Sequence, residues 1–188
     1  TNPQGHGPAW ASSLFEDAAE YGYGMLAGIN HMKERIADLA QSILEKDVSP
    51  DLKSALSEWM ESHHDAVKSR EIRERLVPLP EKDGGECPME LLKLKQYLVK
   101  KSVWSFGGDG FAYDIGYGGI DHVIASGEDI NILVLDTEVY SNTGGQSSKS
   151  TPLAAVAKFA AAGKRVQTKA LGMMAMAYGN VYVAQISM

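Results

Sequence analysis

The sequence has 188 residues, of which 44% are hydrophobic and 22% are charged, enough for one globular domain with a substantial core. Its formal net charge of −6 argues against a nucleic-acid partner. We expect no membrane association and a cytoplasmic location, because no apolar run approaches a span of about 20 residues, no signal peptide is apparent and a single cysteine fits a reducing compartment.

The first hundred residues are predicted to be helical. After a Gly/Pro-rich start, a capping box at Ser13 and Glu16 precedes apolar residues at helical spacing from Leu14 to Ile43. Glycines 22, 24 and 28 mark a close backbone approach or a break into two helices. Ser49 and Pro50 begin a second helix, which buries one face formed by Leu52, Ala55, Leu56 and Trp59.

This helix is expected to continue over residues 62–75 as a highly charged, exposed helix, and the run Val77 to Pro80 ends it. Residues 81–86 are predicted to be a loop, and residues 89–97 a short helix. The sequence does not indicate a role for residues 46–90.

Residues 101–188 alternate between strand and helix patterns. Strands are predicted over 102–106, 130–135 and 181–186, and helices from Asp114, from Thr151-Pro152 to Gly163, and from Thr168 to Gly179. A polar loop spans 140–150. This order predicts an α/β fold with a mostly parallel sheet flanked by helices, in which ligands lie at the carboxyl ends of the strands.

The glycines around Asp109 point to a phosphate site. Gly108 and Gly110 flank the aspartate after a strand, and glycines 116, 118 and 119 occupy the start of the helix that Asp114 is expected to cap. Because packing alone rarely requires three glycines in a helix, we expect a phosphate at its free N–H groups. The spacing does not fit a dinucleotide fingerprint, since Tyr113 and Asp121 stand where glycine is required, and no Gly-Lys-Ser/Thr follows.

An acid beside a diphosphate implies a bridging divalent cation. Asp109 repels phosphate unless Mg²⁺ or Ca²⁺ lies between them, and such ions prefer oxygen ligands. The next strand leads to Thr137, which follows Asp109 by 28 residues (137 − 109), a plausible strand–helix–strand crossover. Asp109 and Thr137 are therefore predicted to share a cation; alternatively, Asp109 is a turn residue bonded to local backbone.

These motifs resemble the C-terminal thiamine-diphosphate domain of the pyruvate:ferredoxin (flavodoxin) oxidoreductases. The resemblance rests on residues 107–119, 135–146, 151–164 and, at the N-terminus, 7–17 and 21–25, and it is weakest between Lys46 and Glu90. It implies that thiamine diphosphate and Mg²⁺ bind here, with Asp109, Thr137 and the Val139 carbonyl on the metal and Gly108, Gly110 and Asn142 at the cofactor. Thiamine enzymes commonly have Asn where this chain has Thr137, so Asp136 is the fallback ligand.

The resemblance also implies an activity. Pyruvate would be oxidatively decarboxylated to acetyl-coenzyme A, with electrons passing through iron–sulfur clusters to ferredoxin or flavodoxin. The chain would then be one partial domain of a longer, homodimeric enzyme, with a helical part (1–100) and a diphosphate-binding core (101–188). One cysteine cannot ligate a cluster, so the isolated chain is expected to lack turnover. Another thiamine-dependent 2-oxoacid oxidoreductase or decarboxylase, or a cofactor-binding module without activity, remain alternatives.

Several residues keep two interpretations at this stage. Asn142, expected near the reactive end of the cofactor as a catalytic residue, can also be a left-handed turn residue. Phe15 faces the cofactor or belongs to the core. Lys164 and Arg165 complement a helix end or bind a distant phosphate such as that of coenzyme A.

Overall fold

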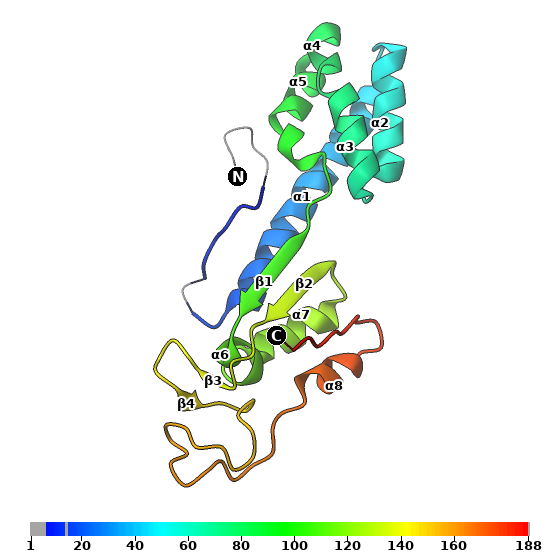
Figure 1. The fold of residues 1–188 in the computed structure, drawn as a ribbon. Coiled ribbons are helices and arrows are strands. Elements are labelled where there is room, and N and C mark those ends of the chain that lie inside the picture. The colour runs from blue at the N-terminus through cyan, green and yellow to red at the C-terminus, as the bar shows by residue number, and fades with distance from the viewer. Residues whose placement is uncertain (1–6, 14, 188) are drawn as a thin grey trace. The chain divides into compact units, whose positions relative to one another are not determined.

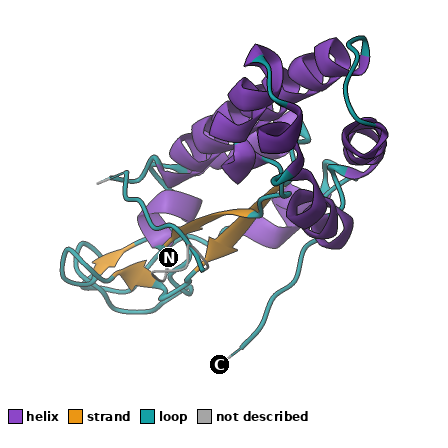
Figure 2. Cartoon of the chain, turned by 90° about the horizontal axis from the view of Figure 1, so that it is seen from above, coloured by secondary structure: helices purple, strands orange, loops and turns teal. Residues whose placement is uncertain are grey.

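The computed structural model describes residues 7–13 and 15–187, and Figure 1 shows its elements in chain order. It divides into an α/β unit, residues 1–24 and 103–188, and a helical unit, residues 25–102. The mixed helix and strand content seen in Figure 2 confirms the predicted α/β class with a helical N-terminal part. Residues 1–6 of the expected irregular start, and Leu14 of the expected first helix, lie outside the described residues. No described helix has the length and apolar character needed to cross a membrane.

The helical unit is built from amphipathic helices. Helix α1 (Ala18–Leu44) runs without the predicted break at its glycines, and the close approach holds at Gly22, where an added Cβ would lie 2.1 Å from Ser105 Oγ. Helix α2 (Pro50–Ser62) begins as predicted, with Leu52 N donating to Ser49 Oγ at 3.3 Å. The remaining elements are α3 (Ala66–Leu76), α4 (Leu79–Asp83), α5 (Glu86–Lys93) and the 3-10 helix η1 (Lys95–Tyr97).

Two boundaries in this unit differ from the sequence prediction. The charged helix is separate from α2, because Asp65 forms a new N-cap that accepts from the backbone N–H groups of Val67 and Lys68, both at 2.9 Å. Residues 81–86 are not a loop, since α4 and α5 occupy most of them, with Gly84 and Gly85 between the two helices at positive φ. Glycine tolerates that conformation and so allows a very short connection.

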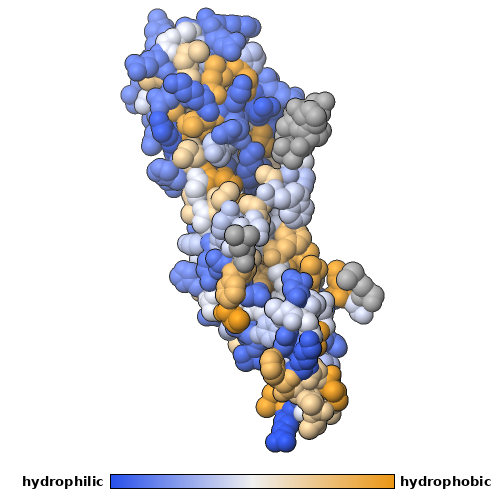
Figure 3. All heavy atoms as spheres, turned by 90° about the vertical axis from the view of Figure 1, so that its left-hand side faces the viewer, coloured by the Kyte–Doolittle hydropathy of each residue, from blue (hydrophilic) through white to orange (hydrophobic). Residues whose placement is uncertain are grey.

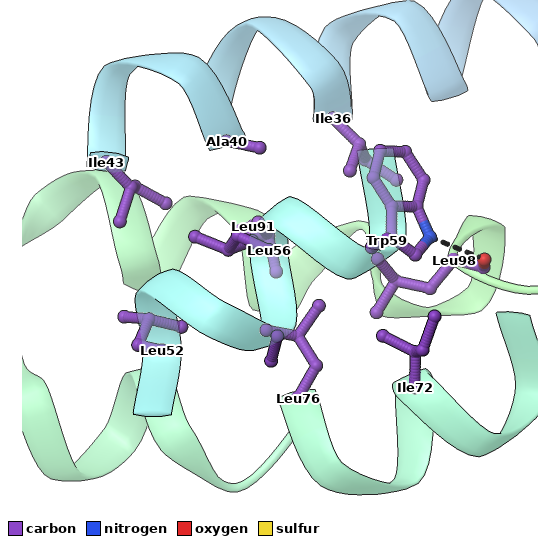
Figure 4. Packing of buried hydrophobic residues seen from close by; sticks show 11 residues of the cluster. Ile36, Ala40, Ile43, Leu52, Leu56, Trp59, Ile72, Leu76, Leu91 and Leu98 are labelled. Atoms are coloured by element: carbon purple, nitrogen blue, oxygen red, sulfur yellow. Dashed lines mark hydrogen bonds between the residues drawn. The ribbon is translucent and has the colours of Figure 1, made fainter. Parts of the chain in front are cut away.

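The core of the helical unit surrounds Trp59. The predicted face of α2 is buried in full, and its residues pack with Ile36, Ala40 and Ile43 of α1 and with Ile72, Leu76, Leu91 and Leu98 (Figure 4). Trp59 is fully buried, and its Nε1–H donates to the Leu98 carbonyl at 2.8 Å. The apolar face thus accounts for the association of these helices, while one hydrogen bond satisfies the indole.

The Asp65 cap predicts a pH dependence of stability. Hydrogen bonds from the Lys68 and Val67 backbone lower the pKa of Asp65 below its ordinary value of 3.8. The cap therefore stabilises the fold fully above that value, and its contribution is lost as the pH falls through the lower folded-state pKa. Asp65→Asn keeps an acceptor at the cap without the titration. Urea midpoints measured from pH 6 to pH 2 should fall less steeply for this variant; parallel curves would contradict the assignment.

The α/β unit is centred on a parallel strand pair. Strand β1 (Val103–Gly107) pairs with β2 (Ile130–Val134) from Val103↔Ile130 to Gly107↔Val134, and α6 (Asp109–Tyr113) and α7 (Tyr117–Ser126) form the crossover. This confirms the predicted parallel sheet. A short antiparallel hairpin, β3 (Val139–Tyr140) and β4 (Gln146–Ser147), follows β2, and α8 (Leu171–Met176) comes late in the chain.

Helices cover one face of this sheet. Ile130, Ile132 and Val134 pack on a core that contains Ala19, Phe111, Ile120 and Val123. The register places Trp104, Phe106 and Leu133 on the opposite face, where each remains at least 39% exposed. On the face drawn in Figure 3, hydrophobic residues are exposed among hydrophilic ones.

The alanine-rich segment after Pro152 is not the predicted helix. Its backbone groups are used in long-range pairs instead: Ala154 N donates to the Lys164 carbonyl at 2.8 Å, and Ser147 N donates to the Lys158 carbonyl at 2.9 Å. Ala154 and Phe159 also adopt positive φ, which no helix tolerates. Alanine propensity is worth less than 1 kcal/mol per residue, so these tertiary hydrogen bonds override it.

The last two predicted elements are also different. The helix expected over 168–179 is reduced to α8, and residues 181–186 are not assigned to a strand. Val181 and Val183 are half-buried and Tyr182 is exposed, so the alternation that predicted the strand exists. Alternation alone does not make a strand, however, because a strand needs a hydrogen-bonded neighbour, and within the described residues the parallel sheet consists of β1 and β2.

Candidate cation and cofactor site

Asp109 stands where β1 ends and α6 begins, and it is 3% exposed. Its Oδ1 accepts a hydrogen bond from the Thr137 backbone N–H at 3.0 Å, and the Thr137 hydroxyl oxygen lies 3.3 Å from the same atom. The strand register explains the meeting, since parallel β1 and β2 end at the same edge and deliver the two residues side by side. The structure therefore brings Asp109 and Thr137 together.

Val139 joins the same group of oxygens through its backbone. The Thr137 hydroxyl donates to the Val139 carbonyl at 2.9 Å. This tight turn depends on Glu138, which adopts a left-handed φ of 61°, a conformation that costs a non-glycine residue about 1–2 kcal/mol. The Thr151 hydroxyl holds the turn by donating to the Glu138 carbonyl. A carboxylate, a hydroxyl and a carbonyl oxygen are thus gathered by linked hydrogen bonds.

The second oxygen of Asp109 has partners that the sequence prediction missed. Ser148 and Ser150, both buried, donate their hydroxyls to Asp109 Oδ2, with a distance of 2.6 Å for Ser148. They lie 39 and 41 residues from Asp109, beyond any local motif. The one signal in the sequence was the density of hydroxyls, four within residues 147–151, immediately after the predicted polar loop.

The glycines around the site serve close packing as well as access. A Cβ on Gly110 would lie 2.3 Å from Glu16 Oε1, whereas one on Gly108 would make an ordinary contact with the Leu135 carbonyl. A Cβ on Gly116 would lie 2.2 Å from the Glu16 carbonyl, and one on Gly119 would meet the Glu20 carboxylate. The expectation that packing does not require these glycines is therefore wrong for Gly116, whose Cβ would meet backbone atoms. A Cβ on Gly119 would meet only the end of the flexible Glu20 side chain, whose carboxylate lies at the start of α7.

Other candidate residues are engaged elsewhere. Asp114 does not cap α7, because Gly116 is the N-cap. The Asp114 carboxylate instead accepts from Lys149 Nζ at 2.7 Å and from Lys149 N at 3.2 Å. Burial alone would raise the pKa of Asp114, but hydrogen bonds from Lys149 and the Tyr140 hydroxyl, together with the charge of Lys149, lower it below its ordinary value. Asp136, the fallback ligand, accepts from the Tyr113 hydroxyl at 2.6 Å and from Glu138 N at 2.9 Å.

The structure also shows the surroundings of Asn142 and Lys164. Asn142 is exposed in the turn between β3 and β4, and it is not among the residues bonded to Asp109. Lys164 is buried, and its Nζ donates to the carbonyls of Lys149 at 3.1 Å and of Thr151. It therefore serves neither as an exposed helix-end charge nor as a surface phosphate ligand, while Arg165 is exposed.

A cavity of about 340 Å³ opens within the α/β unit close to this group. Its lining combines aromatic and polar side chains from the N-terminal segment, the hairpin and the following loop, namely Phe15, Glu16, Ile115, Tyr140, Thr143, Gln146, Ser147 and Phe159. Burial, and then the nearby charge of Asp109, raise the pKa of Glu16. Negative potential is thus concentrated at this end of the cavity, as a cation site requires.

The oxygens at Asp109 match the chemistry of a hard divalent cation. Mg²⁺ is commonly held by one or two carboxylates together with neutral oxygens and phosphate, and the group here offers one carboxylate, one hydroxyl and one carbonyl. The described residues contain no cluster of three or more His, Cys, Asp and Glu side chains suited to a metal. The set therefore resembles a site that relies on a phosphate ligand to complete its coordination, more than an all-protein cage.

Comparison with known proteins places this geometry in a family. Residues 92–187 match the model of the thiamine pyrophosphate enzyme, C-terminal TPP binding domain. The chain belongs to this family. The matched region contains the whole oxygen group and the parallel strand pair, so the family assignment and the site rest on the same residues.

Similar proteins extend over the full chain. It is 57% identical to a pyruvate-flavodoxin oxidoreductase of Klebsiella pneumoniae, 54% to a pyruvate:ferredoxin oxidoreductase of Moorella thermoacetica and 50% to a pyruvate-flavodoxin oxidoreductase of Enterobacter agglomerans. Each match covers 100% of this chain but only 16–17% of the relative. The chain therefore spans about one sixth of the length of these proteins.

Proposed function

We propose that this chain forms the part of a pyruvate:ferredoxin or pyruvate:flavodoxin oxidoreductase that holds thiamine diphosphate through Mg²⁺. One observation carries the proposal: residues from two neighbouring strand ends, 28 positions apart, converge as an oxygen group within hydrogen-bond distance. In this role Asp109, Thr137 and the Val139 carbonyl are the metal ligands. The family match and the names of the similar proteins support it.

The residues around the cation group have separate roles in binding the rest of the cofactor. Gly108 and Gly110 keep side chains away from the strand end, and Gly110 has no space for one. Asn142 belongs to the hairpin turn whose neighbours Tyr140 and Thr143 line the cavity, and we assign it to the reactive end of the cofactor as a catalytic residue. Phe15 and Phe159, which are 70% and 93% exposed, also line the cavity and offer apolar surface to a bound ring.

Thiamine diphosphate, when bound, supplies the electron sink that decarboxylation of a 2-oxoacid requires. The overall reaction proposed is oxidation of pyruvate with coenzyme A to acetyl-coenzyme A and carbon dioxide, with electrons passed to ferredoxin or flavodoxin. Iron–sulfur clusters and the remaining domains would be supplied by other parts of a homodimeric, cytoplasmic enzyme, because Cys87 is the single thiol here. We therefore expect the chain alone to bind cofactor without turnover.

Calorimetric titration tests the proposal. Thiamine diphosphate titrated into the purified chain should give binding heat when Mg²⁺ is present and none after EDTA treatment. Thiamine monophosphate is the matched control, because it keeps the rings but lacks the diphosphate that chelates the metal. Binding heat that is independent of Mg²⁺, or no heat with any ligand, would contradict the proposal that this chain binds thiamine diphosphate through Mg²⁺.

A further inference from the structure

The two oxygens of the Asp109 carboxylate have different surroundings. Oδ1 faces Thr137, on the side where the Val139 carbonyl also lies. Oδ2 instead accepts from two hydroxyls, those of Ser148 and Ser150, which are 5% and 2% exposed. A carboxylate oxygen offers about two lone-pair sites, so the two serine donors use both sites of Oδ2. Oδ1 keeps one site beside the Thr137 N–H, because the single proton of the Thr137 hydroxyl goes to the Val139 carbonyl, at 2.9 Å against 3.3 Å for Oδ1.

The hydroxyl pair is itself held in place by its own loop. Ser148 Oγ accepts from Ser150 N at 3.0 Å and lies 2.8 Å from Ser150 Oγ, and Ser148 N donates to the Thr151 hydroxyl at 2.9 Å. Lys164 Nζ joins the carbonyls on either side of Ser150, those of Lys149 and Thr151. The donors to Oδ2 are therefore pre-organised, and swinging them away would break several buried hydrogen bonds.

The number of carboxylate oxygens with a lone pair left for a metal affects the binding of Mg²⁺ and of Ca²⁺ differently. Mg²⁺ is small, requires near-octahedral geometry and binds ligands at about 2.0–2.1 Å, which suits one oxygen from each carboxylate. Ca²⁺ binds at about 2.3–2.6 Å and accepts both oxygens of one carboxylate. A carboxylate whose second oxygen is already bonded offers Mg²⁺ all that it needs but denies Ca²⁺ its two-oxygen mode.

We propose that Ser148 and Ser150 are positioning residues that restrict Asp109 to binding a cation through one oxygen, and so make the site prefer Mg²⁺ to Ca²⁺. The proposal rests on the cation site of the proposed function and adds the origin of its selectivity. The serines act through Asp109 and need not touch the metal or the cofactor.

The test compares two metals in matched variants. MgCl₂ and CaCl₂ are titrated separately, by calorimetry, into metal-free chain containing thiamine diphosphate, for the wild type, Ser148→Ala, Ser150→Ala and the double variant. Loss of such an indirect partner typically weakens metal binding about 10–100-fold. We expect a loss of that size for Mg²⁺ in the double variant and a much smaller one for Ca²⁺, so that the preference for Mg²⁺ falls about tenfold or more.

Controls separate selectivity from folding. Ser150→Thr keeps a hydroxyl and should retain the preference, and Ser57→Ala removes an exposed serine of α2 in the helical unit and should leave both affinities unchanged. Equal losses of affinity for both metals would leave the ratio of the two affinities unchanged. That result would indicate a purely structural role for the serines and overturn the inference. If the wild type binds both metals as proposed but the ratio does not move, this inference alone fails; if the wild type shows no metal-dependent cofactor binding, the proposed function fails with it.

Discussion

Replacing Asp109 by asparagine should reduce the Mg²⁺-dependent affinity of the chain for thiamine diphosphate by more than about 100-fold. Loss of an outer partner of a metal ligand already costs about 10–100-fold, and Asp109 is the proposed ligand itself. Asparagine also removes the negative charge and replaces one carboxylate oxygen by an amide donor. That donor would face either the Ser148 and Ser150 hydroxyls or the Thr137 N–H, all of which now donate to Asp109.

The matched control for this prediction is Asp136→Asn, one residue before Thr137. Asp136 is the fallback ligand expected from the sequence, but its oxygens accept from the Tyr113 hydroxyl and the Glu138 backbone N–H. We expect its replacement to change cofactor affinity far less. Calorimetry in the presence and absence of Mg²⁺ measures both variants. A larger loss for Asp136→Asn than for Asp109→Asn would move the cation site to the other acid.

Local sequence patterns predicted the centre of the site because strand ends determine it. Asp109 follows β1 directly and Thr137 follows β2 within three residues, so a parallel pairing in register is enough to bring them together. The buried serines could not be found in this way. Their contact with Asp109 depends on how the loop after β4 folds back, and that loop is held by Lys164 and Thr151 through hydrogen bonds that no periodicity records.

Apolar spacing and helix propensity predicted the structure well where a helix packs within its own unit. They predicted it poorly where hydrogen bonds between polar groups determine the backbone conformation. The apolar face of α2 is buried as its spacing predicted. In contrast, residues 151–163 are rich in alanine, but short turns and bonds to residues outside the segment, such as Ala154 N to the Lys164 carbonyl and Lys158 N to the Gly145 carbonyl, replace a helix. Gly116, the N-cap of α7, shows the same limit, because a Cβ there would lie 2.2 Å from the backbone carbonyl of Glu16, about a hundred residues earlier.

Trp59→Ala should lower the free energy of unfolding of the helical unit by about 3–5 kcal/mol, the usual cost of truncating a large buried aromatic residue. Trp59 is fully buried among Ile36, Ile72 and Leu98 (Figure 4). Its ring also stacks on His63, with ring centroids 4.9 Å apart. Truncation leaves a cavity and also deprives the Leu98 carbonyl of the indole donor. Urea denaturation followed by circular dichroism at 222 nm measures the change.

Trp59→Phe separates the two causes of that loss. Phenylalanine keeps most of the apolar volume but cannot donate to the Leu98 carbonyl, so the variant isolates the cost of an unsatisfied buried acceptor, about 1–3 kcal/mol. We expect the alanine variant to be clearly less stable than the phenylalanine variant, since the cavity adds to the lost hydrogen bond. Equal stabilities of the two variants would mean that the surrounding side chains fill the cavity left by the indole. The hydrogen bond to the Leu98 carbonyl, more than the volume of the indole, would then stabilise the packing of α2 against Leu98.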